Sequence, residues 1–387
     1  MAAKSWILTD RSDRTYIENL TSGPEDVGGQ VHGYSIRKLV LRGGLSEGID
    51  LIHIDNGLMR FAVLPTRGMG IWRAWIEEDA VGWNSPVPGP VHPAFVPLSD
   101  PSGLGWLDGF DELLVRCGLE SNGAPDFDDA GRLRYALHGR IANKPAHFVS
   151  LLVDGNTGKI TLRGIVDEVR FHFFKLRLHT EITTCVGEPW IEIVDTIENL
   201  SASPTEAQLL YHANFGPPWL DPGAKLIAPV KTVVPRDAHA AKDIGQWARY
   251  GEPAPGAAEQ VYFFELLGDE QQETMVLLKN SLGTRGIALS FNLEQLPCFT
   301  QWKNEIAEAD GFVTGLEPAT NFPNTRTFES QQGRVLQLEP HGKAELRVRI
   351  AVYHSPDEVH LAEQEIAAMQ LQPARVLEQP QAPWCQL

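Results

Sequence analysis

Ionisable side chains suited to acid-base chemistry stand at the ends of four apolar runs, each beside a glycine or a proline. They are Arg67, His138, His212 and Glu317, in the segments 64–70, 135–140, 209–216 and 315–321. A side chain where a strand meets a turn can point into a cleft, although a histidine beside a glycine is more often a turn or core residue. Two imidazoles, a carboxylate and a guanidinium together suit proton transfer on an uncharged, hydroxylated substrate. The combination predicts an open cleft for such a substrate.

The chain is also rich in tryptophan, whose flat ring can stack on the C–H face of a sugar. Ten tryptophans are present, and Trp106, Trp219, Trp247 and Trp302 stand in loops or at strand ends near the four segments. Most tryptophans in a large domain are buried in its core. Among these we expect Trp302, with its neighbour Lys303, to form a platform for the sugar.

Alternating apolar and polar residues predict that most of the chain is antiparallel β-sheet. Residues 176–183 and 346–352 are clear examples. One segment, 357–369, is expected to be helical, because Ser355 can cap it and Pro356 suits the first helical position. Many strands with so few helices do not fit a βαβ succession. We therefore expect an all-β fold, a large antiparallel β-sandwich with few short helices.

No internal repeat and no linker divides the chain. We expect one sandwich over residues 35–370, an N-terminal extension over 1–34 and a C-terminal tail over 371–387. Two segments with little periodicity, 84–109 and 237–258, are candidates for the walls of a cleft, because long loops in compact domains are usually functional or disordered.

Composition narrows the choice of partners and location. The formal net charge of -17, from 33 Lys and Arg against 50 Asp and Glu, would repel a nucleic acid. No apolar run reaches the roughly 20 residues of a membrane-spanning helix, and the N-terminus lacks a signal-peptide pattern. The four cysteines have no metal-ligand spacing, which indicates free thiols in a reducing compartment. We expect a cytoplasmic protein without a cofactor or metal, whose partner is a small-molecule sugar rather than nucleic acid or membrane.

Four motifs follow one another along the chain: Thr66-Arg67-Gly68-Met69-Gly70, Arg116-Cys117-Gly118-Leu119, His138-Gly139-Arg140 and Gly315-Leu316-Glu317-Pro318-Ala319-Thr320-Asn321. In this order they resemble the aldose 1-epimerase (galactose mutarotase) superfamily, and more closely its bacterial branch described as domain of unknown function 4432. The resemblance extends over roughly residues 35–369. It implies a galactose mutarotase-like supersandwich.

The resemblance also implies an activity. In that superfamily a carboxylate takes the proton of the anomeric hydroxyl while a histidine protonates the ring oxygen, and the opened sugar rotates about C1–C2 and closes to the other anomer. By this likeness Glu317 is the base and His212 the acid. His138 and Arg67 would bind the sugar and stabilise charge on its oxygens, and Asn321 joins the substrate-binding residues. We expect an isomerase that interconverts the anomers of a free or modified sugar.

The chain departs from the superfamily in two places. The acid histidine stands in Tyr211-His212-Ala213-Asn214-Phe215-Gly216, where an Asn-His-x-Tyr-Phe-Asn pattern is usual. The superfamily also has an aspartate that holds sugar hydroxyls between this histidine and the glutamate. Asp221 and Asp237 both compete for that role, and the sequence does not choose between them.

Two enzyme classes with other chemistry are disfavoured. A cupin-type metal site is not expected, because no His-x-His pair with a following Glu occurs. A glycosidase needs two carboxylates that flank the scissile bond. Glu317 has no evident partner for this role, although Asp111, Glu112 and Glu120 stay open.

Two alternatives remain. The first is a non-catalytic carbohydrate-binding or regulatory sandwich with the same cleft. The second is an epimerase or isomerase of an acidic or phosphorylated sugar, which would need the cationic side chains of Arg67, Arg140, Arg236 and Lys303. A homodimer is also left open.

Overall fold

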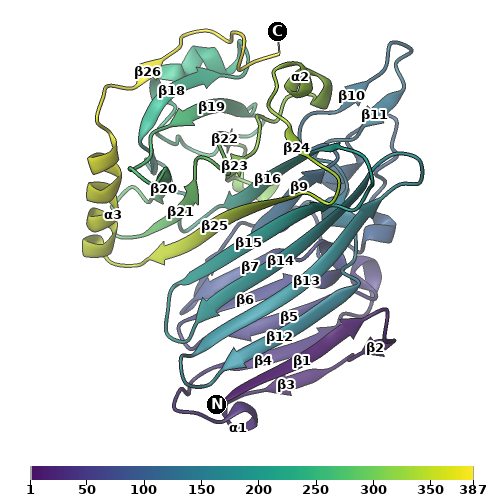
Figure 1. Cartoon of the computed structure of the whole chain (residues 1–387). Coiled ribbons are helices and arrows are strands. Elements are labelled where there is room, and N and C mark those ends of the chain that lie inside the picture. Colours follow the sequence, from purple (N-terminus) through teal and green to yellow (C-terminus); the bar gives the residue numbers. More distant parts are fainter. Residues whose placement is uncertain (1, 387) are drawn as a thin grey trace.

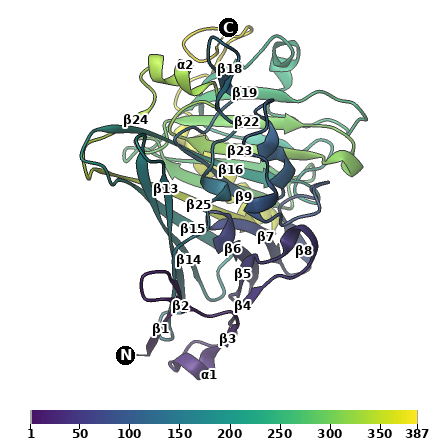
Figure 2. The same cartoon turned by 90° about the vertical axis from the view of Figure 1, so that its right-hand side faces the viewer.

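The computed structural model describes residues 2–386, and within them two large sheets pack face to face (Figures 1 and 2). The first sheet contains, in spatial order, β17 (Lys225–Ile227), β20 (Glu273–Lys279), β21 (Gly286–Asn292), β25 (Lys343–Tyr353), β15 (Trp190–Asn199), β14 (Lys175–Cys185), β13 (Lys159–Val169), β12 (Phe148–Asp154), β1 (Ala3–Asp10) and β2 (Thr15–Tyr16). Its neighbouring strands pair antiparallel, as the alternation of residues predicts.

The second sheet carries the residues of interest. It contains, in spatial order, β26 (Arg375–Val376), β18 (Val230–Pro235), β19 (Gln260–Leu266), β22 (Cys298–Asn304), β23 (Val313–Ala319), β16 (Thr205–Phe215), β9 (Leu114–Leu119), β7 (Gly70–Ile76), β6 (Met59–Leu64), β5 (Asp50–Asp55), β4 (Ser35–Val40) and β3 (Leu20–Ser22). Two short strands flank this path, β24 (Leu336–Leu338) beside β16 and β8 (Asp79–Val81) beside β7. A separate hairpin is formed by β10 (Asp126–Phe127) and β11 (Leu133–Tyr135).

The core lies between the sheets. Alternate residues of β14, such as Leu178 and Ile182, are buried in one cluster with Phe61 and Val63 of β6. Burying each such side chain contributes ~1.5–3 kcal/mol. The predicted all-β sandwich is confirmed, and the predicted strands 176–183 and 346–352 lie within β14 and β25.

Helices are few and short, as predicted. They are α1 (Pro24–Val27), α2 (Arg326–Gln331) and α3 (Pro356–Met369). The helix α3 begins as expected, since the Ser355 side chain accepts a hydrogen bond from the backbone N–H of Glu358. It packs against β20 and β21 through Val359, Ala362 and Ile366 (Figure 1).

A buried ion pair joins the two sheets. Arg116 of β9 donates from Nε to Asp195 Oδ2 of β15 (2.5 Å) and from Nη2 to Thr180 Oγ1 (2.7 Å). Both charged side chains are fully buried. The motif that begins at Arg116 therefore links the two sheets and positions β9, which pairs directly with β16.

Both ends of the chain join the sheets. The strand β1 of the segment 1–34 pairs with β12, and β26 of the segment 371–387 runs parallel to β18. The expected boundaries at residues 35 and 370 stay predictions.

Two loop segments were expected to form cleft walls. Residues 84–109 contain the 3-10 helices η3 (Pro93–Phe95) and η4 (Gly105–Gly109). Trp106 of η4 and the adjacent Phe110 pack on Val115 of β9 and Leu210 of β16, so this segment covers the second sheet. Residues 237–258 contain η6 (Ala240–Gln246).

Candidate active site

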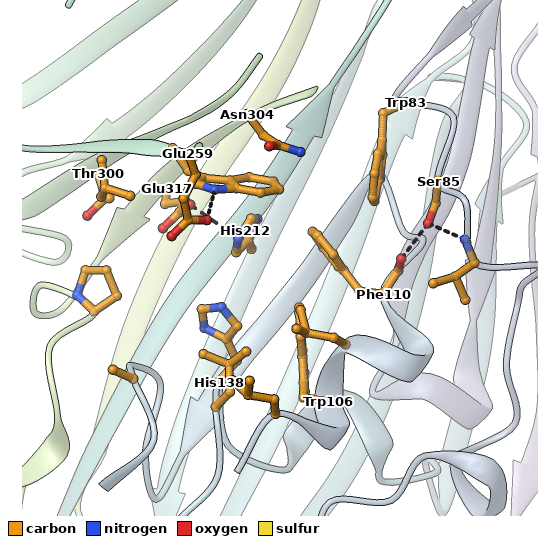
Figure 3. A pocket seen from close by; sticks show the side chains of 18 of the residues that line it. Trp83, Ser85, Trp106, Phe110, His138, His212, Glu259, Thr300, Asn304 and Glu317 are labelled. Atoms are coloured by element: carbon orange, nitrogen blue, oxygen red, sulfur yellow. Dashed lines mark hydrogen bonds and ion pairs between the residues drawn. The ribbon is translucent and has the colours of Figure 1, made fainter. Parts of the chain in front are cut away.

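A cavity of about 440 Å³ lies between the second sheet and the loop that packs on it (Figure 3). Small-molecule sites usually have such volumes. The sheet contributes His212, Glu317, Thr300, Trp302 and Asn304. The covering segment contributes Ser85 and Trp106, and Trp83 and Phe110 adjoin its two ends. The expectation that the first loop is a wall is confirmed. The same expectation is wrong for the second loop, because no residue of 237–258 lines the cavity. Only Arg236 and Glu259, which flank this loop, do so.

His212 and Glu317 form the centre of the site. They come from the adjacent antiparallel strands β16 and β23, where Ala213 is paired with Leu316. His212 Nε2 lies 3.3 Å from Glu317 Oε1, and the two side chains are only 5% and 3% exposed. The structure thus brings together the two residues expected to transfer protons.

Gly315 makes this contact sterically possible. A methyl group at this position would lie 2.7 Å from Glu317 Oε1 and 2.9 Å from His212 Cε1. Any side chain here would push the carboxyl and imidazole groups apart. The glycine of the last motif is therefore explained by its neighbours rather than by a turn.

The tautomer of His212 is set by Asn214. The Asn214 Nδ2 amide donates to the backbone oxygens of Glu112 (3.0 Å) and His212 (3.1 Å), which leaves its Oδ1 as an acceptor. His212 Nδ1 lies 2.7 Å from that oxygen and must therefore carry a proton. In a neutral imidazole the lone pair is then on Nε2 and points to Glu317.

His138 stands beside this pair. Its ring lies 5.3 Å from that of His212 and 4.6 Å from that of Trp106 (centroid distances). Its Nδ1 donates to the backbone oxygen of Asn122 (2.9 Å), so Nε2 is left as an acceptor. The backbone of His138 has a left-handed φ of 56°, a strained conformation that clusters at functional sites.

Burial favours the neutral forms of all three groups. It raises the pKa of Glu317 to about 8, and the negative charge of Glu259 acts in the same direction. Burial and the neighbouring His138 lower the pKa of His212 well below its usual value. Burial lowers the pKa of His138 to about 4. Burial thus favours a protonated Glu317 carboxyl beside a neutral His212, whose Nε2 lies 3.3 Å from Glu317 Oε1.

Trp302 lines the cavity, as expected, and a carboxylate holds it in place. Its Nε1 donates to Glu259 Oε2 (2.7 Å), and Glu259 Oε1 accepts from Arg236 (3.1 Å). The sequence reasoning missed Glu259, which directly precedes β19 in a region without a motif. A carboxylate one residue before a strand is too common to be a signal.

The expected partner Lys303 lies elsewhere. Its side chain points away from the cavity and donates to the backbone oxygen of Arg249 (2.8 Å), and it pairs with Glu305 (3.3 Å). Successive residues of a strand point to opposite faces, so Trp302 and Lys303 could not both face the sugar.

Arg67 is also outside the cavity lining. It is buried, and its Nε donates to Glu112 Oε1 (2.6 Å). Its Nη atoms donate to Asn143 Oδ1 and to the backbone oxygens of Val91 and Gly109. Arg67 therefore fixes the covering segment from behind.

The remaining candidates have structural partners. Asp221 accepts from the backbone and hydroxyl of Ser281 (2.8 and 2.5 Å). Asp237 accepts from the backbone N–H groups of His239 and Ala240 at the start of η6 and pairs with Arg236 (3.0 Å). Neither aspartate lines the cavity. The side-chain amides of Asn321 and Asn122 form two reciprocal hydrogen bonds (2.8 and 2.9 Å). The backbone oxygen of Asn122 accepts from His138 Nδ1. Asn321 thus supports the site indirectly.

The fold and site can now be compared with known proteins. The sequence profile of the family described as domain of unknown function DUF4432 matches residues 46–352. The chain belongs to the DUF4432 family. A structure from Klebsiella pneumoniae, described as a candidate aldose 1-epimerase, is 34% identical to this DUF4432 protein, with a TM-score of 0.95. The match covers 98% of this chain and 99% of that one.

More distant structures share the fold alone. A galactose mutarotase-like protein from Clostridium acetobutylicum is 13% identical, with a TM-score of 0.55 over 82% of this chain and 98% of that one. A candidate aldose 1-epimerase from Escherichia coli K12 is 13% identical, with a TM-score of 0.52 over 79% of this chain and 100% of that one. The DUF4432 protein therefore has a galactose mutarotase-like fold. A comparison with curated proteins gave no match.

Two further features concern metals and membranes. Among residues 2–386, no three His, Cys, Asp or Glu side chains are grouped to hold a metal ion. No helix in this range has the length and apolar character needed to cross a membrane. The four cysteines are all free thiols.

Proposed function

We propose that the protein interconverts the anomers of a free aldose, with Glu317 and His212 as the acid-base pair. The observation that supports this is the 3.3 Å contact between His212 Nε2 and Glu317 Oε1, buried at the base of a cavity that is open to a small molecule. The pair shares one proton. The opening and closure of a hemiacetal need one group that donates a proton and another that accepts one.

The reaction begins with a transfer of that proton. As sugar hydroxyls hydrogen-bond to the carboxyl group, the proton moves from Glu317 to His212 Nε2. Glu317 then takes the proton of the anomeric hydroxyl, the C1–O5 bond breaks, and His212 protonates O5. After rotation about C1–C2, O5 attacks the other face of C1, His212 takes the proton back from O5, and Glu317 returns its proton to O1. Each group thus acts once as acid and once as base.

Other residues of the cavity orient the sugar. His138 Nε2 offers an acceptor to a hydroxyl, and its low pKa keeps it neutral. Thr300, which is paired with Glu317 across β22 and β23, has a buried hydroxyl without a partner. Trp302 presents its ring, held by Glu259. The binding energy of these contacts holds C1 and O5 near the reactive pair.

Exchange NMR tests the proposal. The anomer exchange rates of a panel of neutral, acidic and phosphorylated aldoses are measured with and without the protein, and with Glu317→Gln as the matched variant. Gln keeps the shape of the side chain but cannot transfer the proton, so the rate should fall ~10²–10⁴-fold while sugar affinity changes little.

The same experiment separates the proposal from a non-catalytic sugar-binding domain. If a sugar binds to both proteins but neither increases the exchange rate, the cavity only binds. If Glu317→Gln exchanges a bound sugar as fast as the wild type, the acid-base assignment is wrong.

A further inference from the structure

The two walls of the cavity differ in their chemistry. Figure 3 shows Glu317, Glu259 and Thr300 on one side and the rings of Trp83, Trp106 and Phe110 on the other. Leu104 and Leu107, which lie within two residues of Trp106, and Leu137 also line the cavity. A bound sugar therefore meets hydrogen-bonding groups on one side and mainly carbon atoms on the other.

Most polar atoms of the apolar wall already have hydrogen-bond partners within the protein. Ser85 Oγ donates to the backbone oxygen of Phe110 (2.8 Å) and accepts from the N–H of Val87 (3.1 Å). Trp83 Nε1 donates to the backbone oxygen of Glu112 (3.1 Å). Trp106 Nε1, which is buried without a partner, can serve a single acceptor. A sugar hydroxyl pressed against this wall would lose its water and gain little in return.

The aromatic rings surround the group that acts on the ring oxygen. The imidazole of His212 lies 5.1 Å from the Phe110 ring, 5.5 Å from Trp302 and 6.3 Å from Trp106 (centroid distances). In the proposed function His212 protonates O5. The substituent on C5, the carbon next to O5, would then lie against these rings.

The charges of the cavity disfavour an anionic sugar. Arg236 is the cation among the lining residues, and it is already paired with Glu259 (3.1 Å) and Asp237 (3.0 Å). A phosphate or carboxylate on the sugar would lie near Glu259 and Glu317 without a free cation to neutralise it.

We propose that the substrate is a neutral 6-deoxyaldohexose, whose C5 methyl group packs against Phe110, Trp106 and Trp302. The assignment rests on the proposed function, because it uses the position of His212 at the ring oxygen. A methyl group buries apolar surface against these rings, where the hydroxyl of a hydroxymethyl group would have only Trp106 Nε1 to pair with.

Matched pairs of sugars test this substrate class. D-Fucose is compared with D-galactose, D-rhamnose with D-mannose, and 6-deoxy-D-glucose with D-glucose, with D-glucose 6-phosphate and D-glucuronate as anionic probes. Affinity is measured by titration calorimetry and anomer exchange by NMR. At least one 6-deoxy sugar should bind ~10–100-fold more tightly than its parent, the range that one such group confers in an apolar pocket. Both anionic probes should bind more weakly than glucose.

The outcomes distinguish this inference from the proposed function. Preferential binding of a 6-deoxy sugar without accelerated exchange would support the substrate class and reject the catalytic proposal. Equal or faster exchange of the hydroxymethyl parents would support catalysis and overturn the 6-deoxy assignment. Preference for an anionic probe, or no binding of any sugar, would also overturn it.

A variant of the apolar wall sharpens the test. Leu107→Gln adds a hydrogen-bonding group to this wall, so the ratio of the two dissociation constants within the preferred pair should shrink several-fold. Leu282→Gln is the control, because Leu282 is exposed and lies outside the cavity. If Leu107→Gln and Leu282→Gln gave the same ratio as the wild type, the apolar wall would not be the source of the selectivity.

Discussion

Two buried carboxyl groups in the second sheet region have opposite environments. Glu112 faces the guanidinium of Arg67 at 2.6 Å, and the remaining donors of Arg67 bind Asn143, Val91 and Gly109. Glu317 faces an imidazole at 3.3 Å and an open cavity. A carboxyl group paired with a well hydrogen-bonded guanidinium is typical of a structural role, whereas one that faces a cavity and has a displaced pKa is typical of a functional site.

The two regions are also connected. The backbone oxygen of Glu112 accepts from Asn214 Nδ2, and this bond orients the Asn214 oxygen that fixes the tautomer of His212. The region of Arg67 and Glu112 thus positions the region of His212 and Glu317. We therefore expect substitutions of Arg67 or Glu112 to alter stability, and substitutions of His212 or Glu317 to alter the reaction.

The largest expected effect is on the reaction. His212→Asn and Glu317→Gln should each lower the anomer exchange rate ~10²–10⁴-fold. Because the two groups share one proton, the double variant should lose no more than the worse single variant. Exchange NMR on the two single variants and the double variant measures this. Losses that multiply in the double variant would show that the residues act independently.

The second expected effect is on stability. Arg67→Ala leaves Glu112 as a buried, unpaired charge, which should lower the free energy of unfolding by ~3–5 kcal/mol. Arg163→Ala is the control, since it breaks an exposed pair with Glu181 and should cost ~0–1 kcal/mol. Denaturant unfolding measures both variants. Weaker sugar binding by a fully stable Arg67→Ala protein would instead return Arg67 to the binding residues, as the sequence suggests.

The contrast between Arg67 and His212 also shows what the sequence can predict. The alternation of residues in β14 and β25 and the capping residues of α3 act locally, so the fold class follows from them. Arg67 and His212 both follow an apolar run and precede a glycine or small residue, and the sequence does not distinguish them. Their difference depends on Glu112 and Asn143 in one case and on the cavity in the other. These are long-range contacts that no local pattern encodes.

Asn214 should have a smaller effect on the rate. Asn214→Ala removes the acceptor for His212 Nδ1–H, so the imidazole is no longer held in the tautomer with a free Nε2. We expect a rate loss of ~10-fold, the equivalent of about one hydrogen bond. A change in the 15N shifts of the His212 ring should accompany it. Asn280→Ala, at a distant turn, should change neither the rate nor these shifts.

The last expected effect is the contribution of Glu317 to the pH dependence of stability. Its pKa is about 8 in the folded protein, above the ordinary value of 4.5, so the folded state binds the proton more tightly than the unfolded chain. This contribution is fully present below pH 4.5 and is lost as the pH rises to about 8, by up to ~1.4 kcal/mol per pH unit. His212 has the opposite sign, because its lowered pKa penalises folding below its usual titration range.

The variant Glu317→Gln measures the contribution of Glu317 to the pH dependence of stability. The difference in unfolding free energy between wild type and variant should therefore fall with pH above the usual histidine range and become constant above about pH 8. Glu168→Gln offers a matched control, because Glu168 is another buried carboxyl group whose pKa is raised to about 7, outside the cavity described above. Its difference curve should level off about one pH unit earlier. If the Glu317 curve were flat between pH 6.5 and 8, Glu317 would already be ionised at neutral pH. The assignment of a protonated Glu317 beside a neutral His212 would then be wrong.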